Sequence, residues 1–520
     1  MPAVLLGALS LAYYALYFDA GFNFSDEGNY VQFVYELSRG TSLNDLPVSY
    51  GLLWFKMGEG LFRLFGPDLL LARALFFGCA LVTALLVYAA VFIVTGRPWF
   101  AALIAAVPAA APAFLPTAFY GLCILINAVP QLMLAQRLEN ARPRHAILAG
   151  AALAVSFQIR PDFGYIFAVP LALLLVAATL RGERRLHLIG AAPAAFVLAH
   201  VPGLLLAVGD GYLGALISQY LSYPAMLAGY AVRGVAALTD TGALDAPAAG
   251  TLLARPRLFG AADGAELRLA LLVYLPIVII IAFAIFNLSR LRGAADRVKC
   301  AAALGVILAA GAAAVPHYFF YRPDLSHVAN FMPGFAVLAG VFAWQASQKR
   351  GVMLVCPALV AFTLALYTGE ALTHEGTGSI AGSFARIARF DGANGVHVRV
   401  HPGEKILLDD LKAVIEAHSQ PDDAIVCVPY CPGIAFMTGR RLLFREQYVD
   451  DALPLRDPAW LPGAIALTKE KRPPVVIVMD WAINGTDISR FSRWAAPYME
   501  TLESLKREKL DRPGLSIYLL

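Results

Sequence analysis

Charged residues are scarce in this sequence. Aspartate, glutamate, lysine and arginine make up only 15% of its 520 residues, whereas hydrophobic residues make up 59%. Because about a quarter of the residues in a typical soluble domain are charged, this composition excludes an ordinary soluble domain. The formal net charge is only +4, and no basic stripe with interleaved aromatic residues is present. We therefore expect no binding to nucleic acid.

Cysteine is also rare, with six residues in the whole chain. Four of them fall in apolar runs, where a free cysteine packs as a small hydrophobic side chain: Cys79, Cys123, Cys300 and Cys356. Cys427 and Cys431 have a C-x-x-x-C spacing instead, and an oxidising compartment would allow a disulfide between them. If the segment is a strand, however, four residues span about 13 Å, which is too far for a disulfide. A zinc site would need further ligands nearby, and the sequence has none there.

Long hydrophobic runs dominate the first 370 positions. Runs of about 17 to 25 apolar residues recur there, and each is long enough to cross a bilayer. We expect about eleven membrane-spanning helices on this basis. They lie at residues 2–18, 69–95, 99–116, 118–136, 146–160, 163–180, 186–208, 268–288, 300–316, 329–347 and 351–369.

Basic residues between these runs gather in alternate loops. The loops contain Arg97; Arg137, Arg142 and Arg144; Arg181, Arg184 and Arg185; Arg290, Arg292, Arg297 and Lys299; and Lys349 and Arg350. By the positive-inside rule these loops are cytoplasmic. The N-terminus is then predicted to be cytoplasmic, and both the loop after the first span and the tail after the last span are predicted to lie outside.

The tail differs in kind from the rest, because strand-like and helix-like segments alternate in it. Strands are expected at 395–401, 424–428, 474–479 and 515–519, and helices near 404–418, 458–470 and 487–509. The tail contains no glycine-rich phosphate loop, metal cluster or Ser/His/Asp order, so we interpret it as a cap or acceptor-docking module. The predicted fold class is mostly α: a polytopic membrane helix bundle at 1–372 and a small extracytoplasmic α/β domain at 373–520.

An acidic pair, Asp26 and Glu27, directly follows the first span. Two carboxylates beside hydrocarbon are costly, and they indicate a functional site. Ser25 or Asp26 suits a helix N-cap, and apolar residues recur at helical spacing through 30–37. We expect a short amphipathic helix along the membrane surface. The alternative is that the pair only complements the helix dipole.

Arg160 and Arg322 each stand directly before a proline at an expected outer end of a span, and Asp162 and Asp324 follow those prolines. A guanidinium can hold a phosphate through charge-assisted, bidentate hydrogen bonds, and charged groups at the membrane are functional candidates by default. For Arg160 a local ion pair with Asp162 is the alternative. For Arg322 the alternative is a position in a solvated loop.

The loop of Arg322 also contains His317, Tyr321 and His327. A histidine can add a further hydrogen bond to a phosphate. Counting the predicted spans places this loop on the same outer face as the acidic pair. We therefore count all three residues as site candidates.

Two other candidates lie between the acidic pair and the second span. Tyr50 is an amphipathic residue suited to the membrane interface. Arg73, near the outer end of the second span, either snorkels to the headgroups or faces the acidic pair from within the bundle.

Several short segments together resemble a known family. They are FSDEGNY at 24–30, YGLLWF at 50–55, LFRLFGPDLLLAR at 61–73, IRPDFG at 159–164, YRPDLSH at 321–327 and CVPYCPGIAFMTGR at 427–440. In this order and sidedness, the chain resembles integral-membrane glycosyltransferases of the GT-C fold. The protein O-mannosyltransferases and the lipid A aminoarabinose transferases are the most similar groups, and bacterial members share these stretches.

The resemblance implies inverting transfer of a sugar from a polyprenyl phosphate to an acceptor hydroxyl at the outer face of a bacterial inner membrane. The acceptor is a glycan, a lipid or a protein. Asp26 matches the general base of that family, and Glu27 matches the neighbouring acidic position. Some members of the fold use a divalent cation, so a cation is an open expectation here, although no metal ligands stand out.

For the donor site, we predict that Arg322 binds the phosphate, with His327 or Tyr321 as a neutral donor beside it. Arg160 is expected to assist, and both arginines should converge within about 10 Å of Asp26, since the base and the leaving group flank one anomeric carbon. Two alternatives remain. One is a transporter or lipid flippase of the cell-envelope glycan pathway, and the other is a non-catalytic assembly protein.

Overall fold

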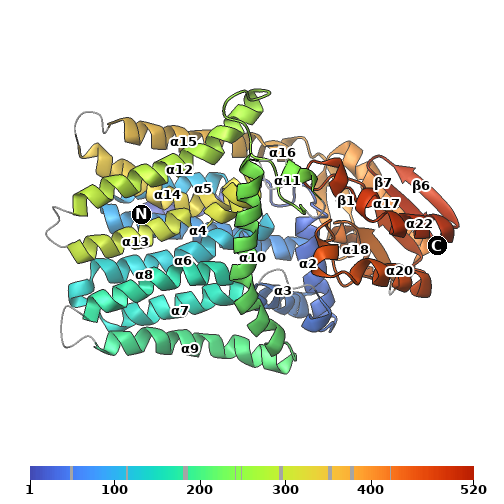
Figure 1. Cartoon of the computed structure of the whole chain (residues 1–520), viewed down its shortest axis with the longest axis horizontal. Coiled ribbons are helices and arrows are strands. Elements are labelled where there is room, and N and C mark those ends of the chain that lie inside the picture. The colour runs from blue at the N-terminus through green and yellow to red at the C-terminus, as the bar shows by residue number, and fades with distance from the viewer. Residues whose placement is uncertain are drawn as a thin grey trace.

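Long helices make up most of the structure (Figure 1). The computed structural model describes residues 1–46, 51–112, 115–179, 186–239, 242–246, 249–291, 297–349, 354–374, 380–421 and 423–520. The helical bundle occupies one end of the molecule, and a smaller part with a β-sheet lies at the other end, where the C-terminus is found (Figure 1).

Helices occupy each position at which the sequence predicts a span. They are α1 (Pro2–Ala15), α4 (Leu69–Thr95), α5 (Pro98–Ala110), α6 (Phe119–Gln136), α7 (Pro143–Ile159), α8 (Pro161–Thr179), α9 (Leu186–Gly209), α12 (Gly264–Leu291), α13 (Arg297–Ala312), α14 (Leu325–Ser347) and α15 (Val355–Thr373). In the described part of the chain, eight helices are long and apolar enough to cross a membrane. Of the other three, α1 and α5 are apolar but shorter, and α7 has 17 residues and does not meet the same criteria, so the number of eleven spans stays a prediction.

Local signals explain where these helices begin and end. Asp68 caps α4, because its Oδ1 accepts hydrogen bonds from the amides of Leu70 and Leu71 at 2.6 and 3.1 Å. Gly96 ends the same helix in the left-handed region, with φ at +65°. Pro98 then starts α5, where the missing amide hydrogen costs nothing. Together they form a tight turn between two neighbouring bundle helices.

Helices α2 (Asp26–Ser38) and α3 (Leu52–Phe65) lie between the bundle and the C-terminal part (Figure 1). The short helix that the sequence predicts along the membrane surface is present, but the exposed polar face expected of an amphipathic helix is wrong: all residues from Gly28 to Leu37 except Asn29 are buried. The helix packs against α3 on one side and α18 (Pro432–Thr438) on another. Its polar side chains therefore contact protein where the sequence pattern suggested water.

Helix α10 (Leu213–Thr239) crosses the end of the bundle, roughly perpendicular to the other long helices (Figure 1). It contacts the short helix η5 (Pro316–Tyr321), which continues from α13. Among the residues that the structure describes between α10 and α12, the short helix α11 (Gly242–Asp245) is the one helix.

The C-terminal part contains a five-stranded sheet with the order β4-β3-β5-β7-β6. Its strands are β3 (Ala424–Val428), β4 (Arg441–Leu442), β5 (Val475–Val478), β6 (Glu508–Arg512) and β7 (Leu515–Leu519). Strands β4, β3 and β5 are parallel, whereas β7 pairs antiparallel with both β5 and β6. A separate antiparallel pair, β1 (Ala388–Asp391) and β2 (His397–Val400), also belongs to this part.

The C-terminal part contains further helices, most of them short. They are α16 (Ile380–Phe384), α17 (Pro402–His418), α19 (Leu453–Arg456), α20 (Trp460–Lys471), α21 (Phe491–Trp494) and α22 (Ala496–Leu505). The single helix predicted at 487–509 is wrong. Helix α22 starts afresh after Ala495, which has non-helical backbone angles (φ −104°, ψ 30°), and Pro497 lies in its first turn. The observed alternation of strands and helices agrees with the predicted α/β class.

Specific contacts fasten the C-terminal part to the bundle. Arg399 in β2 forms an ion pair with Asp19, with Nη2 at 2.7 Å from Oδ1, and the amide of Gly21 donates to the carbonyl of Arg399 at 2.7 Å. At the far end of α2, Arg441 in β4 pairs with Glu36 at 3.1 Å. These contacts place the sheet-bearing part directly over the loop that holds the acidic pair.

Candidate active site

The loop before α2 is built by Asn23. Its Oδ1 accepts hydrogen bonds from the amides of Ser25 and Asp26 at 2.9 and 3.0 Å, and its carbonyl accepts from the amide of Gly28 at 2.8 Å. Ser25 occupies the expected N-cap position, but its side chain makes no capping bond. Its hydroxyl donates instead to the carbonyl of Tyr430 at 2.8 Å. The loop is therefore ordered both by its own asparagine and by a residue of the C-terminal part.

The two acidic residues have different environments. Glu27 is buried and forms a bidentate ion pair with Arg73, with Nε–Oε1 at 2.7 Å and Nη2–Oε2 at 2.8 Å. The same guanidinium donates to the carbonyls of Phe18 and Gly21 at 3.1 and 2.6 Å. Of the two interpretations of Arg73, contact with the acidic pair is the one that the structure supports. Glu27 is held in the protein interior by this pair, whereas Asp26 takes no part in it.

Asp26 accepts a hydrogen bond from the C-terminal part. The hydroxyl of Tyr430 donates to its Oδ1 at 2.7 Å. Tyr430 in turn packs edge-on against Tyr448, with ring centroids 4.6 Å apart. Sequence reasoning missed both tyrosines, because it treated the tail as a module outside the chemistry. The only sequence signal for Tyr430 is that it lies in one of the segments that carry the family resemblance.

The close approach of the two parts depends on glycine. A Cβ added to Gly28 would lie 2.5 Å from the Cα of Gly433, and a Cβ added to Gly433 would lie 2.6 Å from the Cα of Phe24. The amide of Gly433 donates to the carbonyl of Phe24 at 2.8 Å. Because both obstacles are backbone atoms, no side-chain rearrangement could relieve them. The backbones of α2 and α18 thus meet directly beside Asp26.

The protonation of Asp26 reflects its surroundings. Burial by neighbouring protein raises the pKa of its carboxyl, while the hydrogen bond from Tyr430 and the charges of Arg322 and His327 lower it without cancelling the increase. The side chain is nevertheless exposed to solvent. Both observations fit a carboxylate that many protein atoms surround but that water still reaches. Such a group can accept a proton from a bound hydroxyl.

Arg322 and His327 are held by one residue, Asp324. Asp324 caps α14: its Oδ1 accepts from the backbone amide of His327 at 2.9 Å and from the ring Nδ1 at 2.8 Å, and its Oδ2 accepts from Nε of Arg322 at 3.1 Å. Although burial opposes ionisation, His327 and Arg322 hold the pKa of Asp324 well below its usual range. Burial likewise disfavours the guanidinium of Arg322, but Asp324, Tyr448 and Asp26 raise its pKa. Nη1 and Nη2 of Arg322 are not engaged by Asp324.

The tautomer of His327 follows from this contact. An ionised Asp324 only accepts hydrogen bonds, so Nδ1 of His327 carries a proton. A neutral His327 then has a lone pair at Nε2 and accepts there, and only the protonated ring donates at Nε2. This differs from the expectation of a neutral donor beside the phosphate.

The hydroxyl and the carbonyl of Tyr321 both form hydrogen bonds with the segment that follows α11. Its hydroxyl forms a hydrogen bond with the hydroxyl of Thr251, and its carbonyl accepts from the amide of Leu253 at 3.2 Å. Its ring lies 6.1 Å from that of His327, centroid to centroid. Tyr321 therefore joins the 249–253 segment to the Arg322 loop. The remaining candidate in the outer loops, Tyr50, falls outside the described residues.

Arg160 belongs to a buried polar network. Its side chain is only 3% exposed; Nε donates to Asp162 at 2.9 Å, Nη1 contacts the hydroxyl of Tyr120, and Nη2 lies 2.9 Å from Nε2 of His317. Nε2 of His317 also lies 2.9 Å from Asp162. The alternative of a local ion pair with Asp162 thus agrees with the structure. The network also contacts the loop of Arg322, because His317 belongs to η5 and its carbonyl accepts from the amide of Arg322 at 2.9 Å.

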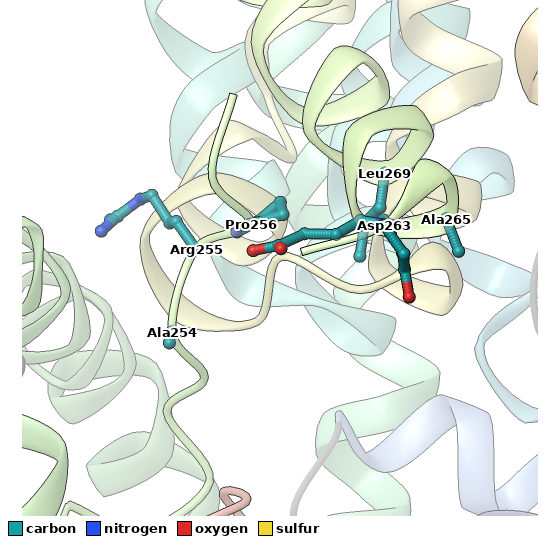
Figure 2. A pocket seen from close by; sticks show the side chains of 7 residues that line it. Ala254, Arg255, Pro256, Asp263, Ala265 and Leu269 are labelled. Carbon is teal, nitrogen blue, oxygen red and sulfur yellow. Dashed lines mark hydrogen bonds between the residues drawn. The ribbon is translucent and has the colours of Figure 1, made fainter. Parts of the chain in front are cut away.

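A pocket of about 430 Å³ lies beside the start of α12 (Figure 2). It is lined by Ala254, Arg255, Pro256, Asp263, Ala265, Glu266 and Leu269, and the guanidinium of Arg255 points away from the other lining residues (Figure 2). None of the residues that surround Asp26 belongs to this lining. We therefore do not assign the chemistry to this pocket. Within the described ranges, no three His, Cys, Asp or Glu side chains form a metal-binding group, and the divalent cation stays a prediction.

Comparison with known proteins supports the fold. No protein-family model matches the chain, and no curated protein matches its sequence. Among solved structures, the chain is similar to the crystal structure of ArnT from Cupriavidus metallidurans bound to undecaprenyl phosphate. The TM-score is 0.51, the identity is 15%, and the match covers 99% of this chain and 97% of the ArnT chain. The predicted fold class is confirmed: the chain shares the fold of this structure, and with the eight long apolar helices of its described part it is an integral membrane protein with a helical bundle and a smaller sheet-bearing part.

Proposed function

We propose that this protein is an inverting glycosyltransferase that moves a sugar from a polyprenyl phosphate to an acceptor hydroxyl. The observation that carries the proposal is the solvent-reached carboxylate of Asp26, held by Tyr430 and lying within the electrostatic reach of Arg322. The similar ArnT structure contains undecaprenyl phosphate, which supports a donor of that class here. We place the site, with residues 373–520, on the extracytoplasmic face because of the distribution of basic loops.

Asp26 is assigned as the general base. In a single displacement, the acceptor oxygen attacks the anomeric carbon, the bond from that carbon to the phosphate oxygen breaks, and the electron pair leaves with the phosphate. The acceptor proton passes to Asp26. Because Tyr430 occupies Oδ1, Oδ2 is the oxygen assigned to the acceptor. The raised pKa of Asp26 brings its basicity closer to neutral pH, where general bases are most effective.

Arg322 is assigned to the donor phosphate. The phosphate gains negative charge as it departs, so a cation positioned beforehand stabilises the transition state more than the ground state. Asp324 orients this guanidinium through Nε alone, which leaves the two terminal nitrogens for a phosphate. We assign His327 a second position at the same phosphate, where its protonated form donates. Arg160 is assigned an indirect function: it contacts His317 and thereby helps to hold the loop of Arg322.

Glu27 is assigned a positioning function. Since both of its oxygens accept from Arg73, it orients the first turn of α2 and thereby Asp26. The transporter alternative would use these charges to line a pathway for the lipid. A solvent-reached base held beside a cation is better suited to transfer, and no observation favours the alternative.

The test is transfer by the purified protein from a panel of polyprenyl-phosphate sugars to lipid, glycan and peptide acceptors. Replacing Asp26 by Asn preserves size and removes basicity, so transfer should fall by a hundredfold or more, roughly the contribution of a general base. The variant should insert and fold normally. A matched control is Asp391→Asn, which removes an exposed carboxylate paired with His397. Wild-type turnover by Asp26→Asn would contradict the proposal, and donor translocation without transfer would favour the transporter.

A further inference from the structure

Two cysteines of the C-terminal part lie together beside the proposed base. Cys427 is the penultimate residue of β3, and Cys431 occupies the N-cap position of α18. Both are buried as free thiols in the same hydrophobic cluster, and the Cys427 thiol is close enough to influence that of Cys431. The Sγ of Cys431 also lies 3.8 Å from the carbonyl oxygen of Val428. The two cysteines thus lie on either side of a short turn at Pro429 and Tyr430.

This geometry removes the objection that the sequence raises against a disulfide. A strand that continued to Cys431 would hold the two residues too far apart, but β3 ends at Val428. The chain then turns at Pro429 and Tyr430, and α18 begins at Pro432. The reversal returns Cys431 to the side of Cys427, where the Cα–Cα separations that a disulfide allows can be met.

A metal site and a nucleophilic thiol both fit this buried cysteine pair less well. In the described ranges, no third His, Cys, Asp or Glu completes a metal site with them. A nucleophilic cysteine needs an electropositive, partly exposed environment, whereas burial, with the neighbouring Cys427 thiol, raises the pKa of the Cys431 thiol well above its usual range. The thiolate that oxidation requires must therefore form before the segment packs, as the chain folds.

We propose that Cys427 and Cys431 form a disulfide that closes the turn carrying Tyr430. Each thiol loses one proton and one electron, and one S–S bond forms. The two electrons reduce a disulfide of a thiol–disulfide exchange partner to two thiols. In an oxidising extracytoplasmic compartment this reaction is favoured. The expected compartment, and the consequence for Tyr430, rest on the proposed function and orientation.

The bond would fix the residue that contacts Asp26. Tyr430 lies inside the ring that the disulfide closes, and the carbonyl of Tyr430 accepts from Ser25 while its hydroxyl donates to Asp26. A closed ring restricts the backbone angles available to Pro429 and Tyr430. The disulfide therefore holds the hydroxyl in place for Asp26, and reduction should loosen this contact.

The test is a thiol count on the full-length protein. Cells that express it are quenched with acid, denatured, and labelled with a maleimide before and after reduction, and the labelled peptides are identified by mass spectrometry. Before reduction, we expect labelling of Cys79, Cys123, Cys300 and Cys356 only. After reduction, all six cysteines should be labelled, and the unreduced sample should contain one cross-linked peptide that joins positions 427 and 431.

The measurement uses the wild-type chain, so it does not depend on whether a cysteine variant folds. Labelling of both Cys427 and Cys431 without reduction would overturn the proposal, and so would a disulfide to another chain or a small thiol at either position. Because no transfer is measured, failure of the proposed enzyme activity would leave this result unaffected. As a second readout, reduction should lower transfer severalfold in the wild type but leave a Cys427→Ser/Cys431→Ser double variant unchanged. An equal decrease in both would overturn the link to Tyr430.

Discussion

Tyr430 and Asp26 are separated by 404 positions in the chain, yet the tyrosine hydroxyl donates to Oδ1 of the aspartate at 2.7 Å. Asp26 begins α2 at the end of the membrane bundle, and Tyr430 lies in the turn between β3 and α18. The candidate site is therefore completed only where the two parts of the molecule meet. This relationship changes the interpretation of the C-terminal part, which supplies a residue to the site in addition to covering it.

Replacing Tyr430 by Phe should shift the pH dependence of transfer. Asp26 acts as a base only when ionised, so the rate rises with pH through its pKa. The Tyr430 hydrogen bond lowers that pKa, and without it the pKa rises further. A hydrogen bond to a charged group contributes about 1.5 to 3 kcal/mol, so the acid limb of kcat/KM should move up by about one pH unit or more. The pH–rate profile checks this.

A matched control for this variant is Tyr518→Phe. It removes a hydroxyl that donates to Glu503 at 3.1 Å, far from the candidate site in the sheet. Its profile should coincide with that of the wild type. A loss of rate in Tyr430→Phe that is equal at every pH would show that Tyr430 affects packing and not the ionisation of Asp26.

Arg322 should set the affinity for the donor. Removing it in Arg322→Ala loses charge-assisted hydrogen bonds to the phosphate and should weaken donor binding about ten- to a hundredfold. Arg322→Lys keeps the charge but loses the planar fork, so its defect should be smaller. Binding of a polyprenyl-phosphate sugar is the measurement. The control Arg257→Ala, which breaks an exposed pair with Glu266, should bind normally, and unchanged affinity in Arg322→Ala would refute the assignment.

Glu27→Gln should chiefly reduce stability. The pair with Arg73 is almost fully buried, and removing one partner from such a pair costs about 3–5 kcal/mol because the other charge loses its compensation. The midpoint of thermal unfolding should fall well below that of Asp26→Asn, which removes an exposed carboxylate and should unfold like the wild type. If Glu27→Gln instead keeps its unfolding midpoint and loses transfer, Glu27 takes part in the chemistry.

Gly28→Ala should separate the two parts of the molecule at the site. The new Cβ would lie 2.5 Å from the backbone of Gly433, and a displacement of about 1 Å at a reacting group can cost a hundredfold in rate. The matched variant Gly60→Ala places a Cβ on a helix where no atom lies within 4 Å, and alanine is the better helix former. Transfer assays should show a large loss in the first and none in the second. Normal transfer by Gly28→Ala would show that this backbone contact is dispensable.

Much of the helical bundle could be predicted from the sequence, because a segment that spans a lipid bilayer must be long, apolar and helical. The Arg322 loop was chosen as a candidate for a related reason, since polar residues at a span boundary are costly. The environments of the two Arg-Pro-Asp segments could not be predicted. Arg160 is buried against Asp162 and His317, whereas Arg322 keeps a side chain that is 24% exposed, and only the surrounding helices decide between these outcomes.

Residues paired across long distances could not be predicted. The buried state of α2 arises because α18 covers the face that the amphipathic pattern suggested for solvent or membrane, and a local pattern does not identify what covers a polar face. Tyr430 was missed for the same reason. Its contact depends on Gly28 and Gly433 letting two backbones meet, and neither glycine differs in sequence from one in an ordinary turn.

The order of synthesis gives the contact between Asp26 and Tyr430 a further consequence. The ribosome delivers the proposed base before helices α4 to α15 have been made, and it delivers Tyr430 only after all of them. A nascent chain thus carries the carboxylate for most of its translation without the residue that completes the candidate site. If the proposed function holds, transfer starts only when residues 373–520 have folded onto the bundle, so that an incompletely made protein would not consume the lipid donor.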